Sequence, residues 1–311
     1  DRMINRLRFA DCYRNNRFSM RPDAAQQGLI GQLQRDGFVV LERHLSPERL
    51  SHMQGDYNQA LRALRFETPC LAQSKIDPVR DADLIQNYLY STPTELSARG
   101  LAFERSDCHS YEQVITEFNP STLTYYPLTD FESFRSVWLD PFVLGIVAGY
   151  LGMVPKMVEA YVRRNFPSPY RTMNHFWHRD LNHKHFMVKV FFFLSDCTLD
   201  NGPHEFIRES QRRFDRFNGK RYYDDAEVDA ACPRGTPDRV ISEVPAGTVV
   251  IEDTRGLHRA DMPKAGYRDL GYATFIPMRP NVDFKYYDFP RSAWSSLSEF
   301  QRAFIPSRNL V

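Results

Sequence analysis

The segment FMVKVFFFL, residues 186–194, indicates most clearly how this chain folds. Its β-branched and aromatic residues favour an extended strand, and a turn sequence, DNGP at residues 200–203, follows shortly after it. Short apolar runs separated by turn residues continue on both sides, from about residue 158 to residue 277. Several short strands with intervening turns predict an all-β sandwich or barrel for this part of the chain.

The expected strands alternate with turn residues along this part of the chain. They are Val158–Arg164, Thr172–Trp177, Phe186–Leu194, His204–Arg208, Arg239–Val244, Thr248–Glu252 and Tyr272–Pro277. A jelly roll closes two such sheets on each other and leaves few strand edges exposed.

Residues before about 155 follow a helical pattern instead. Apolar spacing predicts helices at Ala24–Asp36 and Phe142–Leu151. Ser46 is a suitable cap for a third helix that starts at Pro47 and runs to about Arg65. A short strand at Phe38–Leu41 and a C-terminal helix around Ser298–Phe304 complete the expected elements.

No internal repeat, low-complexity tract or long linker divides the chain, so we expect residues 1–311 to form a single domain. Its expected parts are a helical region to about 155, a β core at about 156–285, a polar insertion or lid near the site mouth at about 209–237, and a tail at 286–311.

The composition is that of an ordinary globular protein, with 42% hydrophobic and 25% charged residues. A net charge of +1 gives no long-range attraction to nucleic acids or anionic membranes. No run approaches eighteen apolar residues, and the N-terminal region lacks an apolar signal-peptide core, so neither a membrane span nor secretion is expected. Five dispersed cysteines indicate reduced thiols and a cytoplasmic location. The oligomeric state stays open.

A possible metal site begins at His178-Arg179-Asp180. On an extended segment, residues two apart share one face, so His178 and Asp180 can both reach one ion. His258, from a distant strand, would complete a facial triad of two histidines and one carboxylate, which suits Fe(II) oxygenases. Arg268 follows ten residues later and can bind a carboxylate through its planar guanidinium.

Five further segments surround these residues in a fixed order, and together they resemble the phytanoyl-CoA dioxygenase family. They read RDGFVVL (35–41), LSPERL (45–50), VKVFFFLSD (188–196), DNGP (200–203) and PAGTVVIED (245–253). The resemblance spans roughly Gly28 to Pro277. It implies a double-stranded β-helix, a jelly roll of the cupin type, with flanking α-helices. It also implies Fe(II), 2-oxoglutarate and O2 as cofactors.

The resemblance further implies a reaction. His178, Asp180 and His258 would hold Fe(II), and Arg268 would bind the far carboxylate of 2-oxoglutarate. A C–H bond of a small-molecule metabolite would be oxidised, with release of succinate and CO2. Asp180 favours hydroxylation, because related halogenases carry a small residue at that position. A non-catalytic ligand-binding or regulatory protein of the same fold is the alternative, and an Fe(II) oxygenase that does not use 2-oxoglutarate is a further one.

Two positions depart from the family pattern. Ala260 stands where a Ser or Thr usually helps to hold the far carboxylate of 2-oxoglutarate. Glu209-Ser210-Gln211 replaces the usual Gly-Ser-His. Neither position belongs to the expected metal triad, but the first leaves the second contact to the cosubstrate undefined.

Other polar residues near the triad have less certain roles. Lys189 is a candidate cosubstrate contact if it points into the barrel, although an outward, solvated side chain is slightly favoured. Arg163, Arg164 and Asn165 end a strand that leads toward the site and could meet a polar or anionic substrate, although a solvated strand end is an equal alternative. Trp177, with a core aromatic as its alternative, and His183 are further candidate substrate contacts. The nearby histidines are not expected to bind the metal: His175, His183, His185 and His204.

Missing residues argue against three other functions. The sequence His178-Arg179-Asp180-Leu181 imitates a protein-kinase catalytic loop, but the required Asn is His185 here and no Asp-Phe-Gly follows. No His-Glu-x-x-His motif or cysteine cluster indicates a zinc hydrolase. No basic stripe indicates a nucleic-acid demethylase.

Overall fold

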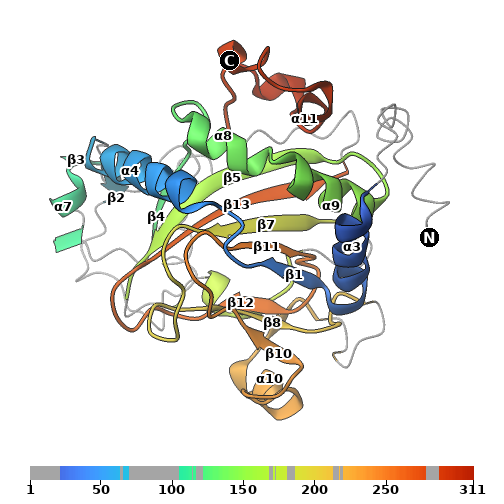
Figure 1. Cartoon of the computed structure of the whole chain (residues 1–311). Coiled ribbons are helices and arrows are strands. Elements are labelled where there is room, and N and C mark those ends of the chain that lie inside the picture. Colours follow the sequence, from blue (N-terminus) through green and yellow to red (C-terminus); the bar gives the residue numbers. More distant parts are fainter. Residues whose placement is uncertain are drawn as a thin grey trace.

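Two antiparallel sheets form the centre of the protein (Figure 1). This computed structural model describes residues 22–63, 66–69, 105–113, 115–116, 122–167, 171, 173–180, 186–212, 217, 220–277 and 287–311. The larger sheet has the order β1 (Phe38–Leu41), β11 (Val249–Glu252), β7 (Val188–Phe193), β13 (Arg268–Ile276), β5 (Lys156–Asn165) and β4 (Thr122–Tyr125). The smaller sheet has the order β10 (Arg239–Ile241), β8 (His204–Ile207), β12 (His258–Ala260), β6 (Trp177–His178) and β9 (Tyr222–Tyr223).

The predicted fold class is confirmed: the chain is mainly β, with two sheets facing each other and helices outside them. Seven predicted strands overlap observed ones, namely β1, β5, β7, β8, β10, β11 and β13. The short strands β4, β9 and β12 have only two to four residues, which is too few for an alternating pattern to identify them. A separate hairpin pairs β2 (Phe66–Pro69) with β3 (Arg105–His109).

One strand prediction was wrong. Within Thr172–Trp177, the described residues form a 3-10 turn, Met173–His175, and only Trp177 enters β6. Arg171 donates to the backbone carbonyl of His175 and thereby supports the turn. Strand β6 is therefore just two residues long, and it places His178 opposite His258 on β12.

Helices begin and end near their predicted positions. Helix α3 spans Ala24–Asp36, α4 spans Pro47–Ala63, α9 spans Pro141–Leu151 and α11 spans Glu299–Ala303. Asp23 and Gln26 form a capping box at the start of α3. Gly37 ends the same helix with a φ of 88°, in the left-handed region that glycine adopts most readily. The amphipathic spacing did not reveal α8 (Glu132–Trp138), which has seven residues.

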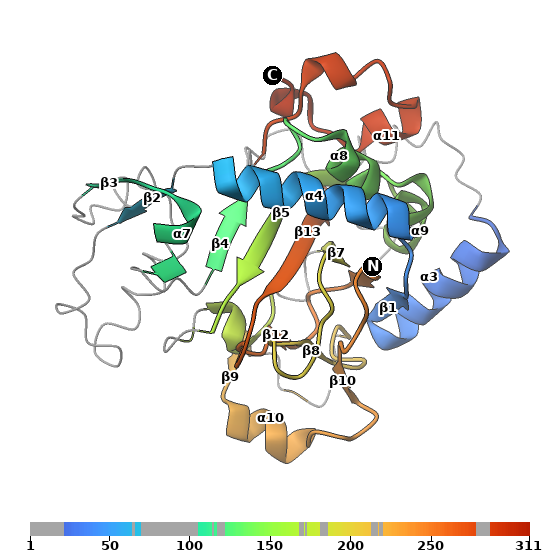
Figure 2. The same ribbon diagram turned by 60° about the vertical axis from the view of Figure 1, so that its left-hand side comes forward.

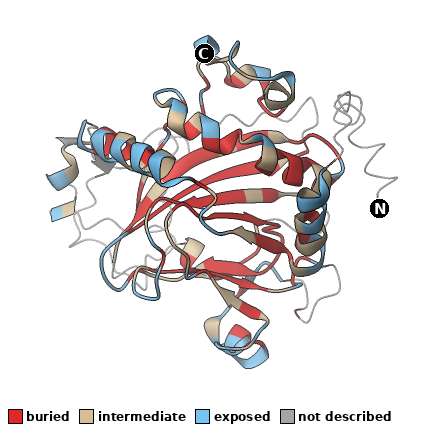
Figure 3. Ribbon diagram, in the orientation of Figure 1, coloured by how far each residue is buried: buried red, intermediate tan, exposed pale blue. Residues whose placement is uncertain are grey.

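The main core lies between the larger sheet and the helices on its outer face. Figures 1 and 2 show α4, α8 and α9 across that face, with the smaller sheet on the opposite side. Trp138 of α8 packs edge-on against Phe192 of β7, with ring centroids 5.2 Å apart. Figure 3 shows the resulting buried layer along both the helices and the sheet.

The stretch Glu132–Leu151, which contains α8 and α9, is apolar and long enough to span a membrane by composition alone. In this fold 61% of its apolar window is buried within the protein. The stretch therefore has the surroundings of a core helix pair.

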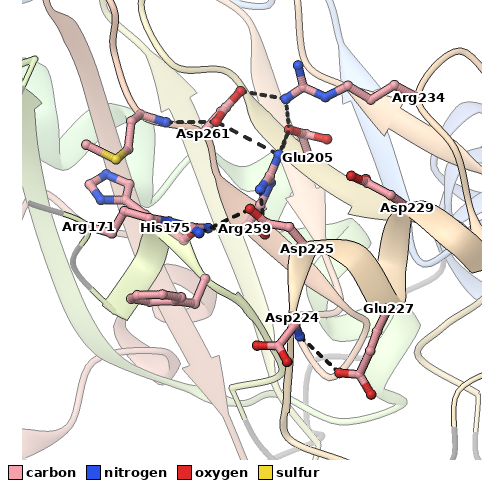
Figure 4. A network of polar contacts seen from close by, with 12 residues as sticks. Arg171, His175, Glu205, Asp224, Asp225, Glu227, Asp229, Arg234, Arg259 and Asp261 are labelled. Carbon is pink, nitrogen blue, oxygen red and sulfur yellow. Dashed lines mark hydrogen bonds and ion pairs between the residues drawn. The ribbon is translucent and has the colours of Figure 1, made fainter. Parts of the chain in front are cut away.

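The expected insertion at 209–237 contributes strand β9 to the edge of the smaller sheet and places helix α10 (Asp225–Ala231) on the outer face of that sheet. Asp225 and Asp229 of helix α10 pair with Arg259 of β12 and Arg239 of β10. Both arginines also pair with Glu205 of β8, which is fully buried (Figure 4). The carboxylate of Glu205 accepts hydrogen bonds from three arginines, Arg234, Arg239 and Arg259. No described residue of the insertion lines the central cavity. The described part of this segment thus has the position of an insertion into the smaller sheet, and a role as a lid stays a prediction.

We propose that the described helices and both sheets belong to one domain. The N-terminal strand β1 pairs along its whole length with β11 in the larger sheet, and α3 packs on α9. Near the C-terminus, the carbonyl of Phe304 accepts a hydrogen bond from the amide of Met157 on β5. Segments from both ends of the chain are therefore built into the same core.

Candidate metal centre

His178, Asp180 and His258 converge between the two sheets. Each offers one ligand atom, and these three atoms all lie within 4.8 Å of one another. Nε2 of His178 is 3.7 Å from Oδ1 of Asp180, and Nε2 of His258 is 3.8 Å from Oδ2. Ligand atoms in cis positions on one ion, with bonds near 2.1 Å, are about 3 Å apart. Small side-chain movements would therefore complete a facial triad.

Strand pairing brings these residues together. His178 on β6 lies directly opposite His258 on β12, so their imidazoles share one face, with ring centroids 4.3 Å apart. Between the two predicted ligands, Arg179 points to the other side and donates to the backbone carbonyls of Ser210 and Arg255. The backbone amide of Asp180 donates to the carbonyl of Thr254, 3.0 Å away. The expected alternation of His178 and Asp180 on one face is thus observed.

Backbone carbonyls orient both imidazoles. Nδ1 of His178 lies 2.8 Å from the carbonyl of Phe176, and Nδ1 of His258 lies 3.0 Å from the carbonyl of Gly256. A carbonyl can only accept, so each Nδ1 carries the hydrogen and each Nε2 keeps its lone pair. Both lone pairs then face the centre, as metal-binding histidines require.

The ionisation of the three groups also fits metal binding. Burial lowers the pKa of His258 to about 3, with a further contribution from His178. Burial likewise lowers the pKa of His178. For Asp180, burial alone would raise the pKa, but Lys189 and the two histidines hold it well below its usual range. At neutral pH the centre therefore contains two neutral imidazoles and one carboxylate.

Lys189 points into the barrel, so the slight preference for an outward side chain was wrong. Its Nζ lies 2.7 Å from Oδ2 of Asp180, and its side chain is 14% exposed. Lys189 is the register partner of Glu252 on β11, whose side chain is buried beside His258. The inward face of β7 therefore carries the lysine, and the carboxylate of Asp180 compensates its charge.

A cavity opens beside the two histidines. It is lined by Arg163, Asn165, Asn174, His178, Lys189, Phe191, His204, His258, Ala260, Arg268, Leu270 and Tyr272. Arg268 is 1% exposed, and its Nη2 donates to Oδ1 of Asn165, which lies opposite it on β5 at 3.3 Å. The structure thus places Arg268 in the same cavity as the two histidines of the triad.

Two of the candidate substrate contacts lie elsewhere. Arg164 is on the helix-covered face of the larger sheet, where its guanidinium forms a two-point contact with Asp269 at 2.7 and 2.8 Å. Trp177 is completely buried on the outer side of the smaller sheet, beneath Arg239 and Arg259. Strand alternation turns both residues away from the cavity. His183 and His185 lie outside the described residues.

The other nearby histidines do not join the triad within the described part of the chain. His175 is buried in the 3-10 turn. His204 lines the cavity, but its Nε2 lies 2.8 Å from Oε2 of Glu252. Ala260 is the register partner of His204, so the position that lacks a hydroxyl faces an imidazole across the strand pair.

The unusual sequence Glu209-Ser210-Gln211 retains one structural role. The Ser210 hydroxyl donates to the carbonyl of Ile207 and accepts from the amide of Leu257 at 2.7 Å, next to His258. Glu209 adopts a φ of 65°, which glycine tolerates more easily. The serine therefore still supports the backbone that carries the second histidine.

Sequence reasoning missed His204 and Tyr272 as cavity residues. Arg163 and Asn165, which line the cavity, were expected together with Arg164 as a strand end that could meet a polar or anionic substrate. Their alternation with Arg164 was a usable signal for a shared face, but it did not indicate which face turned inward.

Comparison with known proteins agrees with this architecture. The family model for phytanoyl-CoA dioxygenase (PhyH) matches residues 33–262. None of the curated proteins matches the sequence. Among solved structures, the non-heme alpha ketoglutarate dependent epimerase SnoN from nogalamycin biosynthesis is 13% identical, with a TM-score of 0.50 and 81% of this chain and 83% of that chain covered.

Two further structures are similar to a comparable extent. AviO1 from Streptomyces viridochromogenes Tue57 is 16% identical, with a TM-score of 0.49 and coverage of 83% of this chain and 96% of that one. HygX from Streptomyces hygroscopicus, with nickel, 2-oxoglutarate and hygromycin B bound, is 12% identical, with a TM-score of 0.48 and coverage of 81% and 87%. Likeness at these identities concerns the fold.

Proposed function

This chain belongs to the phytanoyl-CoA dioxygenase family, and on that premise we propose that it is an Fe(II)- and 2-oxoglutarate-dependent dioxygenase. Its proposed reaction oxidises an unactivated C–H bond of a small-molecule metabolite, most simply by hydroxylation, and releases succinate and CO2. The observation that carries the proposal is the convergence of His178, Asp180 and His258, with both Nε2 lone pairs directed at one point.

Each residue of the centre has a role in this proposal. His178, Asp180 and His258 would hold Fe(II), which supplies the oxidative chemistry when it is bound together with 2-oxoglutarate and O2. Arg268 would bind the far carboxylate of 2-oxoglutarate through its guanidinium fork. Asn165 holds that guanidinium in place from the adjacent strand, at 3.3 Å. The burial of Arg268 strengthens such a contact, because little water competes for it.

Lys189 was also a candidate contact to the cosubstrate. The proposal now gives it a positioning role instead, because its Nζ is already 2.7 Å from Asp180. One carboxylate oxygen would then ligate the metal while the other accepts from Lys189. With its second oxygen occupied by Lys189, Asp180 would bind the metal through a single oxygen. The other coordination positions would then stay open for further ligands.

The presence of Asp180 favours hydroxylation or a related oxidation over halogenation. A small residue at this position would leave space for a halide, whereas a carboxylate occupies that place. The epimerase SnoN is similar to this chain in fold only, and one fold can support several reactions. Experiment therefore has to decide which product the oxidation gives.

The proposed location is the cytoplasm. Cys197 and Cys232 are both buried free thiols. Reduced thiols and an Fe(II) centre are both favoured by a reducing compartment. A small-molecule substrate fits a cavity enclosed between two sheets better than a macromolecule does.

An anaerobic titration tests the function directly. Metal-free protein receives Fe(II) and then 2-oxoglutarate, and the visible charge-transfer band of the chelate is recorded. We expect a band that is lost in Asp180→Ala and in His258→Ala, and formation of succinate once O2 and substrate are added. His52→Ala removes an exposed histidine of α4 and serves as the matched control that keeps the band.

One observation favours the alternative, a non-catalytic protein of the same fold. Lys189 compensates the charge of Asp180 without any metal, so the site is electrostatically balanced on its own. Failure of the wild-type protein to bind Fe(II) would support that alternative. Binding of Fe(II) with an unchanged spectrum on adding 2-oxoglutarate would instead indicate an oxygenase that uses another co-acid.

A further inference from the structure

A pair of polar residues, His204 and Glu252, is buried beside the metal centre and has no role in the proposed function. Nε2 of His204 is 2.8 Å from Oε2 of Glu252, and the two side chains are only 7% and 1% exposed. His204 also lines the central cavity. Polar groups are costly to bury even when they bond to each other, so a pair at this position is a candidate for a further role at the site.

Strand pairing places His204 of β8 directly opposite Ala260 of β12. Residues opposite each other in an antiparallel pair have Cβ atoms about 5 Å apart, and both of these residues line the cavity. Ala260 is the position at which the family pattern has a Ser or Thr that helps to hold the far carboxylate of 2-oxoglutarate. The imidazole of His204 can therefore reach the space that the absent hydroxyl would serve.

The surroundings of His204 fix its ring and place it near Arg268. Its ring centroid is 5.1 Å from that of Phe191 and 5.5 Å from that of His258. Burial and, next, the positive charge of Arg268 lower the pKa of His204 to about 3, so the imidazole is neutral at neutral pH and the guanidinium acts on it from nearby. His204 and Arg268 thus face the same part of the cavity.

The direction of the hydrogen bond between His204 and Glu252 decides what the imidazole offers to a ligand. Within the described part of the chain, Oε1 of Glu252 is buried and has no hydrogen-bond partner. An ionised carboxylate with one oxygen left in that state is strongly disfavoured, so we expect the neutral acid. Its O–H donates to Nε2 of His204, and the single hydrogen of the neutral imidazole is then on Nδ1. Nδ1 thereby becomes a donor suited to a carboxylate.

We propose that His204 replaces the hydroxyl missing at Ala260 and donates a hydrogen bond from Nδ1 to the far carboxylate of 2-oxoglutarate. Arg268 of β13 and His204 of β8 would then hold that carboxylate from the two sheets. Glu252 is a positioning residue, because it fixes the ring and keeps the hydrogen on Nδ1. This inference rests on the proposed function, since it takes 2-oxoglutarate as the cosubstrate.

The test compares two co-acids on the full-length Fe(II) protein without O2. The compound 2-oxopentanoate has the keto acid group of 2-oxoglutarate but a methyl group in place of the far carboxylate. The charge-transfer band of each chelate gives its affinity. In His204→Leu we expect the affinity for 2-oxoglutarate to fall roughly 10- to 100-fold, because a hydrogen bond to a charged group is lost. The affinity for 2-oxopentanoate should stay within about twofold of the wild type.

Two double variants complete the test. In His204→Leu/Ala260→Ser, the new hydroxyl should recover most of the lost affinity for 2-oxoglutarate, because it acts on the same carboxylate. His204→Leu alone leaves Glu252 without its partner, so the measurements are repeated in His204→Leu/Glu252→Leu, where neither polar group remains, with the same expected loss. His52→Leu, which removes an exposed histidine of α4, is the matched control and should bind both co-acids like the wild type.

The outcomes keep this inference apart from the proposed function. An unchanged affinity for 2-oxoglutarate in both variants that lack His204 and the new hydroxyl overturns the inference. An equal loss for both co-acids also overturns it, because His204 would then only support the metal centre. A loss that the hydroxyl of Ala260→Ser does not reverse overturns it as well. All three results leave the proposed function intact, whereas absence of the 2-oxoglutarate band in the wild type contradicts the proposed function itself.

Discussion

Nζ of Lys189 lies 2.7 Å from Oδ2 of Asp180, so a buried ammonium group contacts the carboxylate of the candidate metal triad. Lys189 lies on β7 of the larger sheet and Asp180 follows β6 of the smaller sheet, and their side chains are only 14% and 17% exposed. Before metal binds, each charge is compensated by the other. After metal binds, Asp180 interacts with two cations.

The first prediction concerns this ion pair. Lys189→Met should destabilise the metal-free protein by about 3 kcal/mol, because it leaves Asp180 without its cation in a largely buried place. Saturating Fe(II) or Mn(II) should reduce the difference from the wild type, since the metal then compensates Asp180. Urea unfolding with and without metal measures both values. Lys220→Met, at an exposed position, should show no metal-dependent difference.

The second prediction concerns the cosubstrate. Arg268→Gln should weaken 2-oxoglutarate binding by roughly 30- to 1,000-fold, because a buried two-point contact to a carboxylate is lost. Arg268→Lys should weaken it less, since the charge remains but the fork geometry does not. Metal affinity should stay close to that of the wild type in both variants. An unchanged affinity for 2-oxoglutarate in Arg268→Gln would mean that another residue holds the far carboxylate.

The third prediction concerns pH. Burial lowers the pKa values of His175, His204 and His258 to about 3, whereas burial raises the pKa of Glu252 to about 8. Burial also lowers the pKa of His178, so below an ordinary histidine pKa of about 6.5 the unfolded chain binds three to four protons on these histidines that the folded chain does not. In the same range the folded chain keeps one proton on Glu252. The unfolded chain binds a proton on this residue only when the pH falls to about 4.3.

The difference of two to three protons makes stability fall with falling pH, by roughly 2–4 kcal/mol per pH unit between about pH 6 and 5. Above pH 7 the sign reverses, because only the proton on Glu252 then differs between the states. Urea unfolding of the metal-free protein should thus show maximum stability near pH 7. A free energy of unfolding that stays constant from pH 7 to pH 5 would contradict this account. In His175→Leu the pH dependence of the free energy of unfolding should correspond to about one proton fewer than in the wild type.

The fourth prediction concerns the network under α10. Glu205→Gln should cost about 3 kcal/mol of stability, because Arg239 and Arg259 lose the buried charge that they share. Glu227→Gln breaks only an exposed pair with Lys220 and should cause no measurable change in urea unfolding. Fe(II) affinity should be retained in both variants, since the network lies on the outer face of the smaller sheet. Loss of Fe(II) binding in Glu205→Gln would show that the network also holds β12 in place.

Local sequence patterns predicted several elements accurately. Helix α3 has the predicted bounds because a capping box starts it and a left-handed glycine ends it, and both are short-range features. The alternation of His178 and Asp180 likewise follows from the geometry of one extended segment. The 3-10 turn before β6 was missed, because it depends on a contact from Arg171 that no periodic pattern encodes.

By itself, the sequence determined which residue types alternate along each strand and which histidines and carboxylate form the candidate triad. Only the tertiary structure decided which face of each strand turned inward. Alternation assigns Arg163 and Arg164 to opposite faces, but strand pairing put Arg163 at the cavity and Arg164 beside Asp269. The same applies to Lys189, because its neighbours Glu252 and Asp180 reach it through pairing and packing between distant segments. Side-chain direction has a period of two along a strand, whereas the choice of face is set by long-range burial.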